Sequence, residues 1–446
     1  MLNTKRRFLP FFIALAGFSS ALSAQTVRFN TSLGGIDVVL TPSVTPQTVA
    51  NFMNYVTTGE YNNTIIHRSL NSVNYTTATF YLIQGGGYII KSHLPYLFQP
   101  NNPVPNEFKA SNVRGTIAMA LTGSDINSAN DQWYFNTSDN SASLDAQTFT
   151  AFGSVANNPS LAVMDAINAL PTYTFDGFSD FPFMSNYIAG HTPVDNNYVY
   201  VNSIATLAPS FSGVANAATA IPNSTTGISP GEIITIYGSN IGPTTVTSLE
   251  LDSTGANVVS LLEGTQVTFN GVAGPMIFTF DGQVAVVVPY EIAGQSTVNV
   301  VVSYLGLQTS SKQFNVVPAN PGLFTLSQTG KGDAAIVHAN DGSVVSTSNP
   351  ASPGDVLELY GAGYGVASPS FADGALVTGL PRPVASNALL IDGKTVPTLY
   401  LGGAGGEVNG VMQVNFVVPQ LTAGSHLIQV QVGSAISPAG VTLQTK

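Results

Sequence analysis

The sequence contains no cysteine among its 446 residues. This absence excludes disulfide bonds, zinc sites built on thiolates, and a cysteine nucleophile. Histidine is also scarce, and no two histidines have the i, i+4 spacing of a helical zinc site. We therefore expect no metal and no cofactor. The five histidines are His67, His93, His191, His338 and His426.

Charged side chains are scarce, at 8% of the residues against about 25% in typical globular proteins. The formal net charge is -11, and it becomes -14 without the first 24 residues, which carry three basic side chains and no acidic one. A chain this acidic lacks the basic surface that neutralises phosphates, so we expect no nucleic-acid partner. The 43 glycines and the many short apolar runs are typical of extracellular β proteins.

Residues 1–24 have the pattern of a signal peptide. Lys5, Arg6 and Arg7 precede an apolar run from Phe8 to Ala21, and Ala24 is a suitable last residue before cleavage. The apolar run is shorter than the roughly 20 residues that span a bilayer. We therefore predict cleavage, an extracytoplasmic location (periplasmic or secreted) and no stable membrane insertion.

Residues 25–207 alternate between short strands and two helical patterns. A strand is expected at 27–31 and another at 36–40 after a glycine turn. The first helix would begin at Pro46 with Thr45 as its N-cap, and end at Gly59. The second would begin at Asn158.

The rest of this region follows the same logic. Residues 171–197 are rich in Phe, Asp and Pro and are expected to form a loop. The alternating segment YVYVNSI at 198–204 is then expected to form the last strand of the domain.

Six sequence blocks then occur in a recognisable order: TPQTVANFMNYVTTGEYNNTIIHRS, IQGGGY, RGTIAMA, QWYFN, SLD and FGSV. In order and spacing they are similar to cyclophilin-type peptidyl-prolyl isomerases. The resemblance covers about residues 27–207. It implies an eight-stranded β-barrel with two helices, an isomerase that uses no cofactor, and proline-containing peptides or unfolded secreted proteins as partners.

Prolyl isomerisation needs an apolar pocket for the ring and a donor for the freed nitrogen lone pair. Arg68 suits the donor role because its guanidinium is always charged and carries several N–H groups. The resemblance implies that Arg68 and Gln84 are catalytic. It also implies substrate contacts for His67, Tyr81, Leu82, Ala120, Leu121, Gln132, Tyr134, Leu144 and Phe149.

Three departures from the family pattern stand out. Arg68 and Gln84 are 16 positions apart, about twice the usual separation, because polar residues around 71–79 are inserted. Leu121 replaces a common Asn. Ser143 and Phe149 stand where a Trp and a His are often found. Each departure lowers the activity or inhibitor affinity that we expect, and none removes the arginine.

The C-terminal half has an internal repeat. SPGE at 229–232 recurs as SPGD at 352–355, and QVAVVVP at 283–289 recurs as QVNFVVP at 413–419. The repeat and its alternating Val, Ile and Thr predict antiparallel sandwiches. This half resembles the immunoglobulin-like IPT/TIG class, which implies no catalytic residues. We therefore predict two immunoglobulin-like β-sandwich modules at 208–320 and 321–446 after a barrel domain at 25–207.

The sequence thus predicts a mainly β, secreted peptidyl-prolyl cis-trans isomerase that assists the folding of extracytoplasmic proteins. An alternative is a weak or inactive peptide-binding or adhesion protein, in which the C-terminal modules bind a cell-surface or protein ligand. A glycan hydrolase is less favoured because no supported carboxylate pair is present. A serine hydrolase is less favoured because no GxSxG motif occurs.

Overall fold

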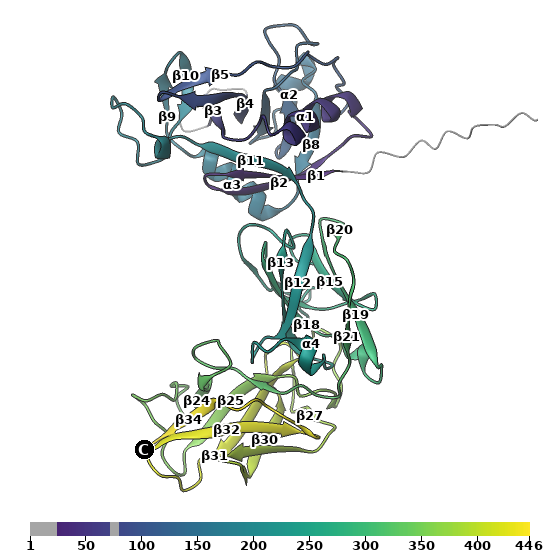
Figure 1. Cartoon of the computed structure of the whole chain (residues 1–446), viewed down its shortest axis with the longest axis vertical. Helices are drawn as coiled ribbons and strands as arrows, with labels where there is room; N and C mark the ends of the chain where they lie inside the picture. Colours follow the sequence, from purple (N-terminus) through teal and green to yellow (C-terminus); the bar gives the residue numbers. More distant parts are fainter. Residues whose placement is uncertain (1–24, 72–79) are drawn as a thin grey trace, which may run out of the picture.

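The computed structural model describes residues 25–71 and 80–446, so the predicted signal peptide lies outside the described residues, as does the inserted segment except for Asn71. Figure 1 shows an elongated molecule with three β-rich bodies that follow one another along the chain. The mainly β fold class is confirmed. Of the helices in the described ranges, none has the length and apolar character needed to cross a bilayer.

The N-terminal body is a closed β-barrel. Its strands are hydrogen-bonded in the order β3-β11-β1-β2-β8-β6-β7-β4, and the pairing of β3 with β4 closes the circuit, while β5 extends from β4. All pairs are antiparallel. The strands are β1 Thr26–Thr31, β2 Gly34–Leu40, β3 Thr64–Leu70, β4 Leu82–Lys91, β5 Leu94–Leu97, β6 Thr116–Met119, β7 Trp133–Asn136, β8 Ala151–Val155 and β11 Tyr200–Thr206.

Two longer helices pack on the barrel, as expected, together with the short α2 (Ser141–Leu144). α1 (Pro46–Thr58) ends at Gly59, whose left-handed φ of 76° favours glycine. The Thr45 side chain does not cap α1, which corrects our expectation. The Glu107 carboxylate accepts the N–H groups of Gln47 (3.3 Å) and Thr48 (2.8 Å) instead.

α3 (Asn158–Asn168) begins where the sequence predicts, and the Asn157 side chain accepts the N–H of Ser160 at 3.0 Å. The segment expected to be a loop at 171–197 instead contains a hairpin of β9 (Thr172–Phe175) and β10 (Phe178–Pro182). Its aromatic side chains pack with Ile65 and Tyr198 in a cluster of their own.

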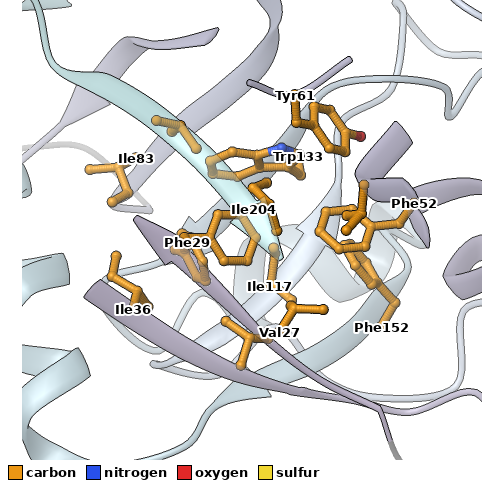
Figure 2. Close-up of a cluster of buried hydrophobic side chains, with 14 of the residues drawn as sticks. Val27, Phe29, Ile36, Phe52, Tyr61, Ile83, Ile117, Trp133, Phe152 and Ile204 are labelled. Carbon is orange, nitrogen blue, oxygen red and sulfur yellow. The ribbon is translucent and has the colours of Figure 1, made fainter. Parts of the chain in front are cut away.

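The barrel interior is filled by large apolar side chains from every part of the circuit. Figure 2 shows Phe29, Phe52 and Trp133 among the aliphatic residues of this core. The rings of Phe29 and Trp133 meet edge to face, with centroids 4.9 Å apart. The barrel is therefore solid, and a binding site must lie on its outside.

Each half of the repeat folds into two packed sheets with a shared apolar core. The first half has β12 Ser210–Asn216, β13 Ile233–Ser239, β14 Thr247–Ser248, β17 Met276–Phe280 and β18 Gln283–Val287 opposite β15 Thr265–Phe269, β16 Val272–Ala273, β19 Thr297–Tyr304, β20 Leu307–Gln308 and β21 Lys312–Asn315; α4 is Asn223–Thr226.

The second half has β22 Gly322–Leu323, β24 Ile336–His338, β25 Val356–Ala362, β30 Thr398–Gly403 and β31 Val411–Val417 opposite β23 Gly332–Asp333, β28 Asn387–Ile391, β29 Lys394–Val396, β32 Gly424–Val432, β33 Ala435–Ile436 and β34 Val441–Thr445. A short ribbon joins β26 Ala367–Ser368 to β27 Arg382–Pro383.

The sequence repeat corresponds to a structural one. β13 pairs with β18 in the first half as β25 pairs with β31 in the second. The turn before each of these strands uses the same bond: the Glu232 carboxylate accepts the Ser229 N–H at 2.8 Å, and the Asp355 carboxylate accepts the Ser352 N–H at 2.7 Å. The acidic residue of the SPGE/SPGD motif therefore closes a turn.

Candidate active site

Arg68 and Gln84 lie directly opposite each other on the paired strands β3 and β4. Gln84 is in turn opposite Tyr134 on β7, and Tyr134 is opposite Ala118 on β6. Residues opposed in this way present their side chains to the same face of a sheet. The register alone therefore brings Arg68, Gln84 and Tyr134, which are distant in sequence, into one row on the barrel's outer face.

This row borders a pocket of about 180 Å³. That volume suits one side chain, since pockets for drug-sized ligands are usually about 300–1,000 Å³. A small apolar cluster, separate from the barrel core, forms its floor. The lining residues are Arg68, Phe80, Leu82, Gln84, Ala120, Leu121, Tyr134, Leu144, Gln147 and Phe149.

The polar groups of the pocket are held by hydrogen bonds. The Gln84 amide nitrogen donates to the Gln132 side-chain oxygen at 2.9 Å, so the two predicted glutamines contact each other. Ala120 N–H donates to the Gln132 carbonyl at 2.9 Å. Arg68 keeps 41% of its side chain exposed, and its Nε lies 3.8 Å from the Asp180 carboxylate. The guanidinium is thus the one cationic group at the pocket rim among the described lining residues.

The apolar wall is also anchored. The Tyr134 hydroxyl donates to the Asn112 side-chain oxygen at 2.9 Å, and burial raises the pKa of Tyr134 well above its usual value. The rings of Tyr134 and Phe149 meet at 80° with centroids 5.8 Å apart. Asn112 also donates to the Phe149 carbonyl at 3.0 Å and to the Asp145 carboxylate at 3.1 Å. One buried amide therefore fixes the wall and the loop after α2.

Eight of the eleven predicted site residues line the pocket. Gln132 does not line it but contacts Gln84, which does. The remaining two lie elsewhere. Tyr81 is not among the residues lining the pocket, and Phe80 takes that place. Side chains along extended backbone alternate between its two faces. Phe80, Leu82 and Gln84 therefore share the face that borders the pocket, and Tyr81 lies on the other face. That periodicity, visible in the sequence, could have identified Phe80. We did not anticipate Gln147 or Asn112.

His67 does not line the pocket either. It is 3% exposed and packs against the rings of Tyr88 and Phe178, with centroids 4.7 Å and 5.6 Å away. Burial, with a smaller contribution from the positive charge of Arg68, lowers the pKa of His67 to about 3. His67 is therefore a neutral, buried neighbour of Arg68 on β3. Within the described residues, no group of three His, Asp or Glu side chains could hold a metal.

Comparisons with known proteins agree with this geometry. The family model for cyclophilin-type peptidyl-prolyl cis-trans isomerases matches residues 26–185. Peptidyl-prolyl cis-trans isomerase A of Dickeya dadantii is 33% identical over 178 residues, which cover 38% of this chain and 86% of that protein. The chain belongs to the cyclophilin-type isomerase family.

Two further peptidyl-prolyl cis-trans isomerases are similar to this chain. An isomerase of Streptomyces antibioticus is 33% identical over 165 residues, covering 92% of its own length. Isomerase B of Escherichia coli is 33% identical over 156 residues, covering 85% of its length. These matches cover 35% and 33% of the present chain, so each relative corresponds to about a third of it.

Proposed function

We propose that this protein is an extracytoplasmic peptidyl-prolyl isomerase that acts on X-Pro bonds of proline-containing peptides and unfolded secreted proteins. The observation that carries the proposal is the cross-strand row of Arg68, Gln84 and Tyr134 beside an apolar pocket the size of one side chain. Membership of the cyclophilin family supports the activity. The signal-peptide pattern supports the location.

The chemistry follows from the barrier. Rotation about a peptide bond costs about 18–20 kcal/mol because resonance makes the C–N bond partly double. In the twisted transition state the nitrogen regains its lone pair. A fixed guanidinium beside the ring stabilises that lone pair more than it stabilises the planar ground state, and this difference lowers the barrier. The apolar wall holds the proline ring while Gln84 holds the flanking backbone. No covalent step is needed.

Isomerisation of a short X-Pro peptide by the full-length protein tests the activity. We expect acceleration by the wild type, a large loss in Arg68→Ala, and no loss in Arg114→Ala, whose side chain is exposed on another part of the barrel. If the folded wild type binds the peptide without accelerating it, the isomerase proposal is wrong. The peptide-binding alternative would then hold.

The location has its own test. We expect the exported protein, purified from outside the cytoplasm, to begin at Gln25, because cleavage after Ala24 removes the basic segment. Mass spectrometry of the intact protein measures this directly. Recovery of the uncleaved chain in the cytoplasm alone would contradict it.

The two C-terminal sandwich modules, which resemble the IPT/TIG class, are proposed to bind a cell-surface or protein ligand and so to place the isomerase near its substrates. Binding of the fluorescently labelled full-length protein to intact cells tests this. The same binding by wild type and Arg68→Ala is expected. Loss of binding in Arg68→Ala would show that attachment runs through the proline pocket instead.

A further inference from the structure

Arg68 has a carboxylate neighbour from a distant part of the chain. Asp180 lies on β10, and its Oδ2 is 3.8 Å from Arg68 Nε. The Asp180 side chain is only 9% exposed, whereas that of Arg68 is 41% exposed. A buried carboxylate is costly unless a cation compensates it. The Arg68 guanidinium supplies a positive charge close to this largely buried carboxylate.

The hairpin that carries Asp180 is held firmly against the barrel. β10 packs on β3, with Phe181 buried in the aromatic cluster that contains Ile65. Phe178 contacts both Tyr88 and His67, with ring centroids 5.1 Å and 5.6 Å apart. Aromatic anchors thus flank Asp180 on both sides along the chain. The carboxylate cannot move away from β3 without opening this cluster.

The strand geometry directs Asp180 toward Arg68. The register between β9 and β10 shifts between Phe178 and Phe181, so that β10 carries one extra residue there. A bulge of this kind changes the direction of a side chain, and such bulges are common beside active sites. Asp180 lies within the bulge. Its direction is therefore a built feature of the hairpin.

We propose that Asp180 is a positioning residue for the isomerase reaction: it holds the Nε edge of the Arg68 guanidinium so that the terminal nitrogens face the proline pocket. The inference rests on the proposed isomerase function. The guanidinium has five N–H groups in a fixed plane, so fixing one edge determines where the other points. The hairpin, a segment that the sequence predicts to be a loop, thereby helps to position the catalytic arginine.

The test compares full-length variants in the X-Pro peptide assay. We expect Asp180→Asn, which keeps the shape and removes the charge, to lower kcat about fivefold, with KM changed less than about twofold. Asp180→Glu should recover part of the loss, since it restores the carboxylate. The matched control is Asp176→Asn, in the turn of the same hairpin, where the left-handed φ of 48° tolerates Asn. This control should keep the wild-type rate.

A double-mutant cycle separates positioning from simple structural support. In an Arg68→Ala background, measured at high enzyme concentration, Asp180→Asn should cause no further loss. Equal losses in both backgrounds, or an unchanged or increased kcat in Asp180→Asn alone, would overturn the proposal.

A second readout does not depend on catalysis. The Arg68 Nε–H resonance, assigned in a ¹H–¹⁵N spectrum with Arg68→Lys, should shift in Asp180→Asn and stay in place in Asp176→Asn. An unmoved resonance overturns the proposal even if the enzyme is active. If the Arg68 resonance shifts in Asp180→Asn as expected but the wild type accelerates no peptide, the isomerase function is refuted and the contact between Arg68 and Asp180 is established.

Discussion

The barrel uses two arginines in opposite ways in two of its regions. Arg68 stands at the pocket with 41% of its side chain exposed and one carboxylate 3.8 Å away. Arg28 lies at the junction with the first sandwich module and is 4% exposed. Its Nε and Nη2 donate to both oxygens of Asp37, at 2.7 Å and 3.0 Å. Within residues 25–71 and 80–446, no hydrogen bond engages the Arg68 guanidinium, so available N–H groups, rather than charge alone, distinguish it from Arg28.

Each guanidinium nitrogen of Arg28 donates a hydrogen bond at the junction. Beyond Asp37, the guanidinium donates to Asp281 and to the Gly242 carbonyl of the first sandwich module. The Tyr304 hydroxyl donates to Asp37, and Asn157 donates to that hydroxyl at 2.8 Å. These groups come from both bodies, so the network joins the barrel to the module. Figure 1 shows the two bodies adjacent along the chain at this point.

The largest expected effect is on stability at the junction. Arg28→Ala leaves the buried Asp37 carboxylate without its bidentate partner, and this should lower the free energy of unfolding by about 3–5 kcal/mol. Denaturant unfolding followed by fluorescence of Trp133, the single tryptophan, measures it. Arg114→Ala is the matched control because its pair with Asp165 is exposed. A loss no greater than in this control would remove the distinction.

Arg68→Ala should show the reverse profile. We expect kcat/KM to fall about 100-fold, which corresponds to about 2.7 kcal/mol of transition-state stabilisation. The free energy of unfolding should fall by less than in Arg28→Ala, because the Arg68 side chain is 41% exposed and its Nε lies 3.8 Å from the Asp180 carboxylate, beyond hydrogen-bond distance. Peptide isomerisation and Trp133 fluorescence together give both values. A destabilisation as large as that of Arg28→Ala would contradict the functional assignment.

His67 should make the pocket region sensitive to acid. Its pKa is lowered to about 3 by burial, against an ordinary value of about 6.5. Its contribution to stability is therefore complete above pH 6.5 and is lost as the pH falls toward 3, by about 1.4 kcal/mol per pH unit. Unfolding at several pH values should give a flatter profile for His67→Gln than for wild type. Identical slopes would show that His67 takes up its proton at the same pH in the folded and unfolded states, so that folding does not lower its pKa.

The smallest expected effect concerns the edge of the junction network. Tyr304→Phe removes the hydroxyl shared by Asp37 and Asn157 and should cost about 1 kcal/mol, with no change in isomerase activity. Tyr96→Phe, at a largely exposed position, serves as the control and should cost nothing measurable. Loss of activity in Tyr304→Phe would mean that the junction and the pocket are coupled.

Local patterns carried much of the fold and part of the site. The apolar face and Gly59 determine α1, and alternating segments determine most strands, because both depend on neighbours within a few residues. The blocks around Arg68 and Gln84 likewise identified the family. The family resemblance predicts Tyr81 in the pocket, but Phe80 lines it, because the alternation of side chains along the extended backbone turns Tyr81 to the other face.

Long-range contacts were beyond the sequence. Arg28 and Asp281 are 253 positions apart, and Tyr304 and Asp37 are 267 apart. Nothing local distinguishes Asp180 from the other acidic residues of a segment that looks like a loop. These partners meet only because whole strands pair and whole domains dock.

The sequence by itself determined the mainly β class, the two halves of the repeat and the identity of the guanidinium at the pocket, since each is written in short-range periodicity or in contiguous blocks. Only the tertiary structure decided that Arg28 is hydrogen-bonded within a buried network and that Arg68 faces the pocket where a substrate would bind. The physical reason is that desolvation and hydrogen-bond geometry depend on atoms that the fold brings together from distant parts of the chain.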